Sequence, residues 1–339
     1  MSFAKNILIV GDNIDVDLVY KIGHIISVND RQLLEWNLFS GSLAGAYLPT
    51  ILCAGRVVAK MKTAPPRTPL LDKIEALALH DRDSICMTLH AHVLGFRGQY
   101  TEALVLIDEV MGAIYPTHLG PLTLNFNDTF PETLPQPWEV YEWLKRRTGD
   151  DEAADAAVRR AAVEFQDPKA LVVHAGRLME RGDLEMYEEC LCKAATAAHP
   201  DACRKLANFY FLIIIGRYPR RGEKDTVQQQ QQQQQEHQEQ TASSTVLSWL
   251  SCFYNRSLPL DDYYKLAREW YELACAHGNS DAALTFALLL REEGNVELGR
   301  HYLDMAAMKP GLASSLRGYR VNWENLDVPM KVDFEKLDV

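Results

Sequence analysis

Cysteine is the residue type in this sequence with the clearest capacity for metal or disulfide chemistry, and three cysteines fall close together. Cys190 and Cys192 are two positions apart in a stretch with a helical pattern, so their side chains point about 200° apart around the helix axis. Cys203 follows in the next helical stretch, where it could meet one of them across a helix pair. Because these spacings differ from those of zinc sites, we expect buried free thiols.

Histidine offers the second candidate for metal binding. His80, His90 and His92 cluster in the sequence, but His90 and His92 diverge around a helix in the same way. We therefore interpret them as core or surface residues, and we predict no metal site and no cofactor.

The sequence carries no complete catalytic motif. Residues 7–13 (Ile-Leu-Ile-Val-Gly-Asp-Asn) resemble a strand that leads into a nucleotide loop, but the further glycines and a following Lys-Ser/Thr are missing. The sequence contains no serine nucleophile elbow and no paired-carboxylate motif. We predict a protein that is not an enzyme and has no catalytic residues; an enzyme with dispersed site residues stays open as an alternative.

Composition and net charge disfavour several classes of binding partner. The chain has 339 residues, of which 47% are hydrophobic and 24% charged, an ordinary globular mixture. A net charge of −11 argues against a nucleic-acid partner and against adsorption to anionic lipid. No stretch reaches the roughly 18 to 20 apolar residues of a membrane span, so we expect no integral membrane segment.

The compartment is inferred from the cysteines and the first residues. Seven cysteines without regular spacing fit a reducing environment. Asp12, Asp15 and Asp17 follow the apolar run at residues 7–10, which matches neither a signal peptide nor a mitochondrial presequence. We expect a cytoplasmic protein; the alternative is a mitochondrial one whose true N-terminus differs from the given one.

A repeated pattern indicates the elements that would position any site. Gly98, Gly149, Gly182 and Gly294 have similar surroundings, each between two helical patterns, with small residues at matching distances on both sides. Gly149 and Gly182 are 33 residues apart, close to the period of a helix-turn-helix unit. Small residues let two antiparallel helices approach, and the glycine supplies the turn between them.

This register predicts five helix pairs between residues 82 and 309. The pairs are Arg82–Leu94 with Thr101–Ala113, Trp138–Arg147 with Asp151–Phe165, Pro168–Glu180 with Leu184–Ala198, Pro200–Ile215 with Asp261–His277, and Ser280–Glu293 with Val296–Met308. Two insertions, at residues 115–137 and 217–260, interrupt the array, and the second contains glutamines at 228–235.

Three regions flank or interrupt this array. Residues 1–81 are expected to form a helical capping region, with helices at Leu33–Lys60 and Pro69–Leu79 and a proline-rich linker at 64–69. The tail at 310–339 and the apolar stretch at 246–254 each either fold back onto the array or dock a partner.

The sequence also resembles tetratricopeptide and Sel1-like repeat proteins, including Sel1-like proteins of filamentous fungi. The resemblance rests on residues 265–274 (Lys-Leu-Ala-Arg-Glu-Trp-Tyr-Glu-Leu-Ala), Gly278-Asn279 and Asp281-Ala282-Ala283, with a second copy 80 residues earlier at Ala194, Asp201, Ala202 and Ala207. The units around Gly98 and Gly182 are closer to tetratricopeptide repeats. The resemblance implies an all-α fold, an α-solenoid of stacked antiparallel helix pairs.

The same resemblance implies a scaffold or adaptor that binds another protein or a peptide segment in a concave groove. The first helix of each pair usually lines that groove, so the candidate groove residues are Tyr141, Lys145, Arg177, Asn208 and Arg291. The candidate docking segment contains Trp249, Leu250, Phe253 and Tyr254. A mitochondrial assembly factor or chaperone for a membrane complex is the alternative function.

Overall fold

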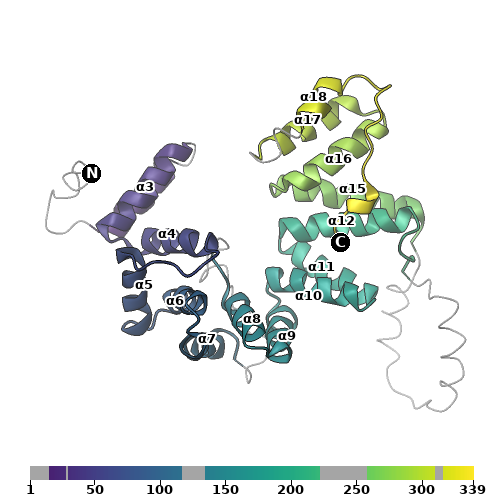
Figure 1. The fold of residues 1–339 in the computed structure, drawn as a ribbon. Coiled ribbons are helices and arrows are strands. Elements are labelled where there is room, and N and C mark those ends of the chain that lie inside the picture. Colours follow the sequence, from purple (N-terminus) through teal and green to yellow (C-terminus); the bar gives the residue numbers. More distant parts are fainter. Residues whose placement is uncertain (1–14, 28–29, 117–133, 222–257, 310–315) are drawn as a thin grey trace, which may run out of the picture. The chain divides into compact units, whose positions relative to one another are not determined.

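The protein is all-α. A computed structural model describes residues 15–27, 30–116, 134–221, 258–309 and 316–339, and all regular structure in these ranges is helical. They form 15 α-helices, one π-helical turn and one short 3-10 helix (Figure 1). The chain divides into two compact units, Met1–Phe165 and Gln166–Val339, which are described separately below.

Unit 1 is built from helices that pack against their neighbours in the sequence. Its elements are α2 (Val16–Ile26), α3 (Arg31–Ala44), α4 (Tyr47–Ala59), α5 (Pro69–Leu79), α6 (Ser84–Phe96), α7 (Tyr100–Ile114), α8 (Pro137–Arg147), α9 (Asp151–Arg159) and the π-helical turn η2 (Arg160–Glu164). α6 pairs with α7 and α8 with α9, and α7 also packs on α8, so the two pairs stack.

Unit 2 repeats this arrangement. Its elements are α10 (Pro168–Glu180), α11 (Leu184–Thr196), α12 (Pro200–Ile214), α15 (Leu260–Ala276), α16 (Ser280–Glu292), α17 (Val296–Ala307), α18 (Arg317–Asn322) and the 3-10 helix η4 (Phe334–Lys336). α10 pairs with α11, α12 with α15 and α16 with α17, while α11 on α12 and α15 on α16 join successive pairs. The predicted pairs and the stacked helix-pair architecture are thereby confirmed.

Each helix begins and ends where local chemistry requires. Asp83, Asp150 and Asp183 cap α6, α9 and α11 by accepting hydrogen bonds from backbone N–H groups of the first turn. The predicted turn glycines take left-handed backbone angles, for example φ 77° at Gly182, and the next N–H bonds back to the helix, from Asp183 to Leu178 at 2.9 Å. The glycines therefore stop one helix and start its partner, as the repeat predicts.

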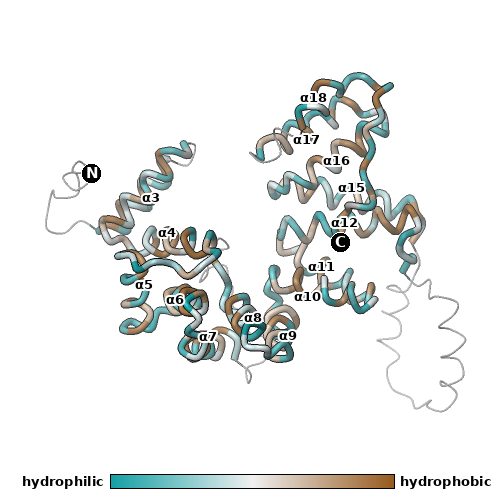
Figure 2. The backbone as a smooth tube through the Cα atoms, viewed as in Figure 1, coloured by the Kyte–Doolittle hydropathy of each residue, from teal (hydrophilic) through white to brown (hydrophobic). Residues whose placement is uncertain are grey.

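Small side chains form the contact inside each pair. The alanines at the matching repeat positions are fully buried, including Ala91, Ala154, Ala194 and Ala306 at 0% exposure. Where the repeat has Gly299 instead, a Cβ atom would lie 2.9 Å from the carbonyl oxygen of Ala287, closer than packed atoms approach. Figure 2 shows apolar and polar residues interspersed along the helices, as expected when each helix has a packed side and a solvated side.

The predicted helix Leu33–Lys60 is wrong as one element. Gly45 has φ 96° and its N–H bonds to Gly41 and Ser42, which ends α3 before α4 begins. A left-handed residue cannot continue a right-handed helix, and glycine adopts this conformation at little cost. Helix α2, before α3, and α18, in the predicted tail, are additional elements that the repeat pattern did not contain.

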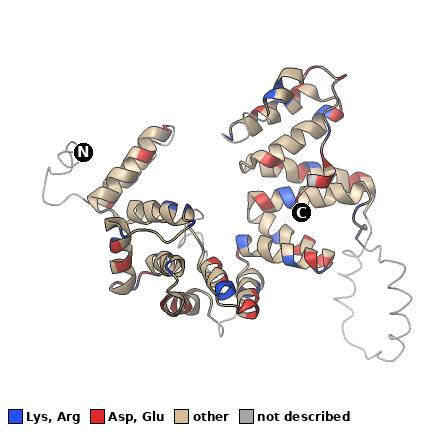
Figure 3. Cartoon of the chain, in the orientation of Figure 1, with Lys and Arg blue, Asp and Glu red and all other residues tan. Residues whose placement is uncertain are grey.

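No single described helix is long and apolar enough to cross a membrane. Gln32–Ala44 and Tyr47–Ala59 reach that length and composition only when taken together, and the chain bends by 110° between them. These two helices also carry few charged residues (Figure 3).

The turn between α11 and α12 has an alanine in a left-handed conformation, and this generates a stability prediction. In the second copy of the repeated motif, Ala198 stands where the first copy has Gly278; its φ is 63° and its side chain is exposed. Left-handed angles cost a residue with a Cβ atom about 1 kcal/mol. We expect Ala198→Gly to raise the melting temperature of unit 2 by about 2 °C, measured by circular dichroism.

The matched control is Gly182→Ala. A Cβ atom there would have no heavy atom within 4 Å, so the substitution adds backbone strain alone. It should lower the melting temperature by about 2–4 °C. A lower melting temperature for Ala198→Gly than for wild type would contradict the assignment of strain to this turn.

Candidate functional site

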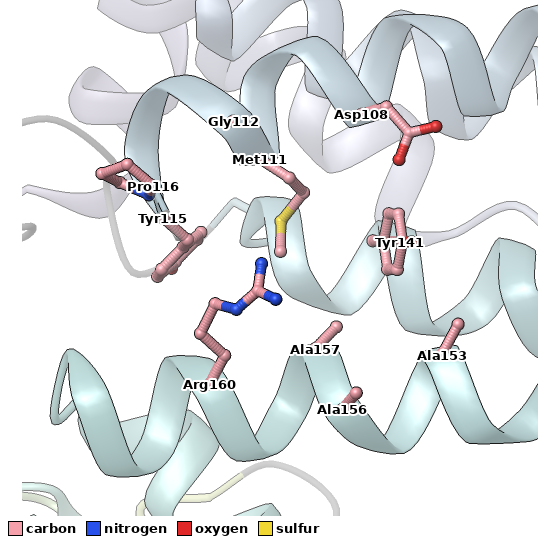
Figure 4. Close-up of a pocket in the computed structure, with 10 residues that line it drawn as sticks. All are labelled: Asp108, Met111, Gly112, Tyr115, Pro116, Tyr141, Ala153, Ala156, Ala157 and Arg160. Carbon is pink, nitrogen blue, oxygen red and sulfur yellow. The ribbon is translucent and has the colours of Figure 1, made fainter. Parts of the chain in front are cut away.

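A hollow of about 440 Å³ lies between α7, α8 and α9 in unit 1 (Figure 4). Its lining comprises Asp108, Met111, Gly112, Tyr115 and Pro116 from α7 and the residues after it, Tyr141 from α8, and Ala153, Ala156, Ala157 and Arg160 from α9 and η2. Most of the lining thus belongs to the second helices of two successive pairs, with one side chain from the first helix between them.

The hollow exists because small residues face each other. Ala153 and Ala157 are one turn apart on α9, and Arg160 follows on the same side of the helix, as the helical period requires. Gly112 on α7 has no side chain, and no heavy atom lies within 4 Å of the place where its Cβ would stand. The space between α7 and α9 is therefore left open.

Arg160 is the principal charged group of the hollow. It is the first residue of the π-helical turn that ends α9, and its guanidinium points into the space beside Met111 and Tyr115 (Figure 4). Among the described residues, this guanidinium has neither an ion pair nor a hydrogen bond. A half-buried arginine that forms no ion pair with a described residue can accept a carboxylate or another anion without first losing a partner, although Asp108 at the other end of the hollow opposes a second negative charge.

Asp108 and Tyr141 lie toward the other end of the hollow (Figure 4). Burial raises the pKa of the Asp108 carboxyl, and nearby Lys145 partly opposes this. Lys145 itself bonds to Asp150 at 3.0 Å and lies 5.5 Å from the centre of the Tyr141 ring. Lys145 thus already has an ion-pair partner within the fold, whereas the Tyr141 ring forms part of the lining of the hollow.

The predicted groove residues fall into two groups. Tyr141 lines the hollow, with Lys145 beside it, and Arg177 on α10 is partly buried. Asn208 and Arg291 are buried, with 1% and 5% exposure, and both bond to residues of the C-terminal segment. The structure therefore brings together Tyr141 and Lys145 alone. The predicted docking residues Trp249, Leu250, Phe253 and Tyr254 lie outside the described residues.

Sequence reasoning missed Arg160, the residue with the clearest binding capacity. The available signal was the run Ala153, Ala156, Ala157 and Arg160, which places three small residues and one cation on the same side of a helix. That run predicts a helix approached closely by a neighbour, but it does not specify a cavity.

A second exposed feature lies on α3. Trp36, Phe39 and Leu43 are 54%, 54% and 84% exposed, and their spacing places them on one face of the helix. Large apolar side chains in a row on the surface are typical of regions that bind other molecules.

The three cysteines that cluster in the sequence bear on the question of a metal site. Cys190, Cys192 and Cys203 are free thiols, and burial raises the pKa of Cys192 and of Cys203 to about 11, which makes both poor nucleophiles. Within the described ranges no three His, Cys, Asp or Glu side chains converge in a way that would hold a metal ion.

Comparison with known proteins adds no assignment. No model of a protein family matches this sequence, and no curated protein matches it.

The environment of His92 gives a testable pH dependence. Its ring packs against Phe96 and Trp143 at 5.1 and 4.9 Å, and Nδ1 is buried without a hydrogen bond to any described residue. Burial lowers the pKa of His92 from 6.5 to about 4. Between these values the unfolded chain binds the proton and the folded chain does not. The free energy of unfolding is therefore highest above about pH 6.5, and it decreases as the pH falls toward 4.

We expect His92→Leu to reduce the loss of stability between pH 7 and pH 5 by about 1 to 2 kcal/mol, measured by urea denaturation at each pH. The control is His301→Leu, because His301 is exposed. An unchanged pH dependence in His92→Leu would show that His92 is not buried in its neutral form.

Proposed function

We propose that this chain is a non-enzymatic scaffold or adaptor that binds a segment of another protein, and that its helix pairs are of the tetratricopeptide/Sel1-like kind. The stacked pairs, the left-handed glycine turns and the buried alanines support the second part of this proposal. Stacking leaves helix surfaces exposed along the array, and such surfaces bind extended or helical peptide segments.

The observation that carries the proposal is the Arg160 guanidinium, which enters the hollow without a partner among the described residues. An arginine retained in this state gains most from a ligand that brings a carboxylate. Met111 and the Tyr141 ring offer apolar surface beside it. The ligand that fits this combination has an apolar or aromatic side chain close to a carboxylate.

A protein segment supplies that combination more naturally than a free small molecule does. The rim of the hollow includes Asp108 and Gly112, which are exposed, so the hollow opens at the surface of α7. Its volume suits one or two side chains inserted from outside. The exposed row of Trp36, Phe39 and Leu43 on α3 offers further apolar surface in the same unit.

The proposal is tested by crosslinking from the hollow in cells. A photoreactive amino acid is placed at Gly112, where a side chain has free space, and the full chain is irradiated. We expect one predominant crosslinked protein, and we expect Arg160→Glu to reduce its yield about tenfold, because charge reversal repels the carboxylate.

The matched control is Arg159→Glu. Arg159 precedes Arg160 on α9 and is exposed, but it does not line the hollow, so this variant makes the same charge change and should keep the wild-type yield. Absence of a crosslinked protein, or equal loss in both variants, would contradict the proposed role of the hollow.

A further inference from the structure

In unit 2, residues 323–339 return across the first helices of two pairs. Figure 1 shows η4 directly beside α12, and Figure 3 shows basic residues on α12 next to the end of the chain. The two predicted groove residues of these helices, Asn208 on α12 and Arg291 on α16, both bond to this segment. The surface that was expected to receive a partner is thus covered by the chain itself.

One end of the segment is anchored in the core. Trp323 is fully buried, and its Nε1 donates to the carbonyl oxygen of Val296 at 3.0 Å. Arg291 donates to the carbonyl oxygens of Trp323, Asn325 and Val328 at 3.0, 2.7 and 3.2 Å. This part of the segment belongs to the fold, because removing it would leave a buried guanidinium without acceptors.

The other end binds one face of α12. Asp338 accepts from Arg204 Nη2 and Lys205 Nζ, both at 2.9 Å, and its backbone oxygen accepts from Asn208 Nδ2 at 2.7 Å. The Phe334 ring stacks on Phe211, with centroids 5.0 Å apart and an interplanar angle of 15°. Arg204, Asn208 and Phe211 recur at intervals of four and three residues, so they form a single binding face.

Some contacts on this face involve the backbone of the segment, and others involve particular side chains. Asn208 binds a backbone oxygen of the segment, and Arg217 donates to the backbone oxygen of Phe334 at 2.9 Å, which any extended peptide can offer. The ring of Phe334 and the carboxylate of Asp338 are the parts that a particular sequence must supply. This combination is typical of peptide recognition, in which backbone bonds give affinity and side chains give selectivity.

The α12 end is also less firmly held than the Trp323 end. The Asp338 side chain is 62% exposed, and Lys331, Asp333 and Glu335 are exposed as well. Arg204 and Lys205 are only 14% and 15% exposed, but the Asp338 carboxylate is open to solvent, so salt screens these ion pairs. Met330 and Val332 are buried, each with 6% exposure, so residues 333–339 are the part that can leave α12 while Trp323 and Arg291 stay in place.

We propose that the α12 face formed by Arg204, Lys205, Asn208 and Phe211 is a second binding site. Its ligand is an extended segment of another protein that carries an aromatic side chain and, four residues later, a carboxylate. Residues 333–339 of this chain occupy the site until such a segment displaces them. This site lies in unit 2 and does not rest on the hollow at Arg160.

The chain's own segment competes more effectively for the α12 face than a free peptide of the same sequence. Tethered at Trp323, it is present at an effective concentration on the order of millimolar, so a free segment must exceed that level or bind more tightly. Weakening the internal segment should therefore expose the site to a peptide in solution.

The test uses the full chain with the double substitution Phe334→Ala and Asp338→Ala, and a fluorescent peptide with the sequence of residues 329–339. Fluorescence anisotropy should show that the peptide binds the double variant at least about tenfold more tightly than wild type. A peptide with alanine at the Phe334 and Asp338 positions should not bind, and binding of the native peptide should weaken with added salt.

Two charge reversals define the receptor side in the double-variant background. Lys205→Glu should abolish peptide binding, whereas Lys265→Glu, an exposed lysine of α15 outside the contact, should leave it unchanged. Equal binding to wild type and to the double variant, or binding that ignores the two side chains of the peptide, would overturn the proposal. Arg160→Glu should have no effect here, which separates this test from the test of the hollow.

A measurement on the wild-type chain covers the case in which the variants do not fold. Excess isotopically labelled peptide should increase hydrogen exchange at residues 333–339, detected by mass spectrometry, without increasing it around Trp323. Unchanged exchange at saturating peptide would overturn the proposal. So would a dimer at high wild-type concentration by light scattering, since the occupant would then be the segment of a second copy.

Discussion

The close approach of two helices within each pair is the constraint on which the rest of the structure depends. A helix of about 13 residues is not stable alone in water, and it gains stability by burying one face against a neighbour. Buried alanines such as Ala91 and Ala194, and Gly299 at its equivalent position, bring the backbones together over a short contact. The outer face of each pair is still apolar in part, so successive pairs must stack.

Both proposed sites follow from this construction. Stacked pairs present helix faces side by side, and a cation on such a face can pair locally with a carboxylate even though the net charge of the chain is −11. At Arg160 small neighbours leave a hollow around the cation. On α12, Arg204 and Lys205 already hold Asp338. One architecture thus places a cation at both proposed binding sites.

The sequence allowed the helix pairs to be predicted because their signals are local. A glycine such as Gly182 and an aspartate such as Asp183 after it act within one turn of the chain, and alanines repeat at the period of the pairs. Ala198 shows where this reasoning ends, since it adopts the glycine conformation without being glycine. The break at Gly45 was missed because no matching small-residue pattern marked the two helices beside it.

The sites were less predictable because they depend on residues distant in sequence. Asn208 and Arg291 lie on first helices, as predicted, but their partners are backbone oxygens of residues 323–339. Every residue has such an oxygen, so the sequence does not indicate which of them a side chain will contact. The hollow depends on the rotation of three helices about their own axes. Spacing alone places Arg160 on a face of α9 but does not determine how far α7 stands from it.

The pairing of α12 with α15 has a consequence for how this chain tolerates change. The two helices pack together although residues 215–259 lie between them in the sequence, and the backbone N–H of Arg221 donates to the Tyr263 hydroxyl at 3.1 Å. Their pairing therefore rests on contacts between residues that are distant in sequence. Tolerance to substitution is lowest on the facing sides of these two helices, where fully buried residues such as Ala207 and Tyr271 lie.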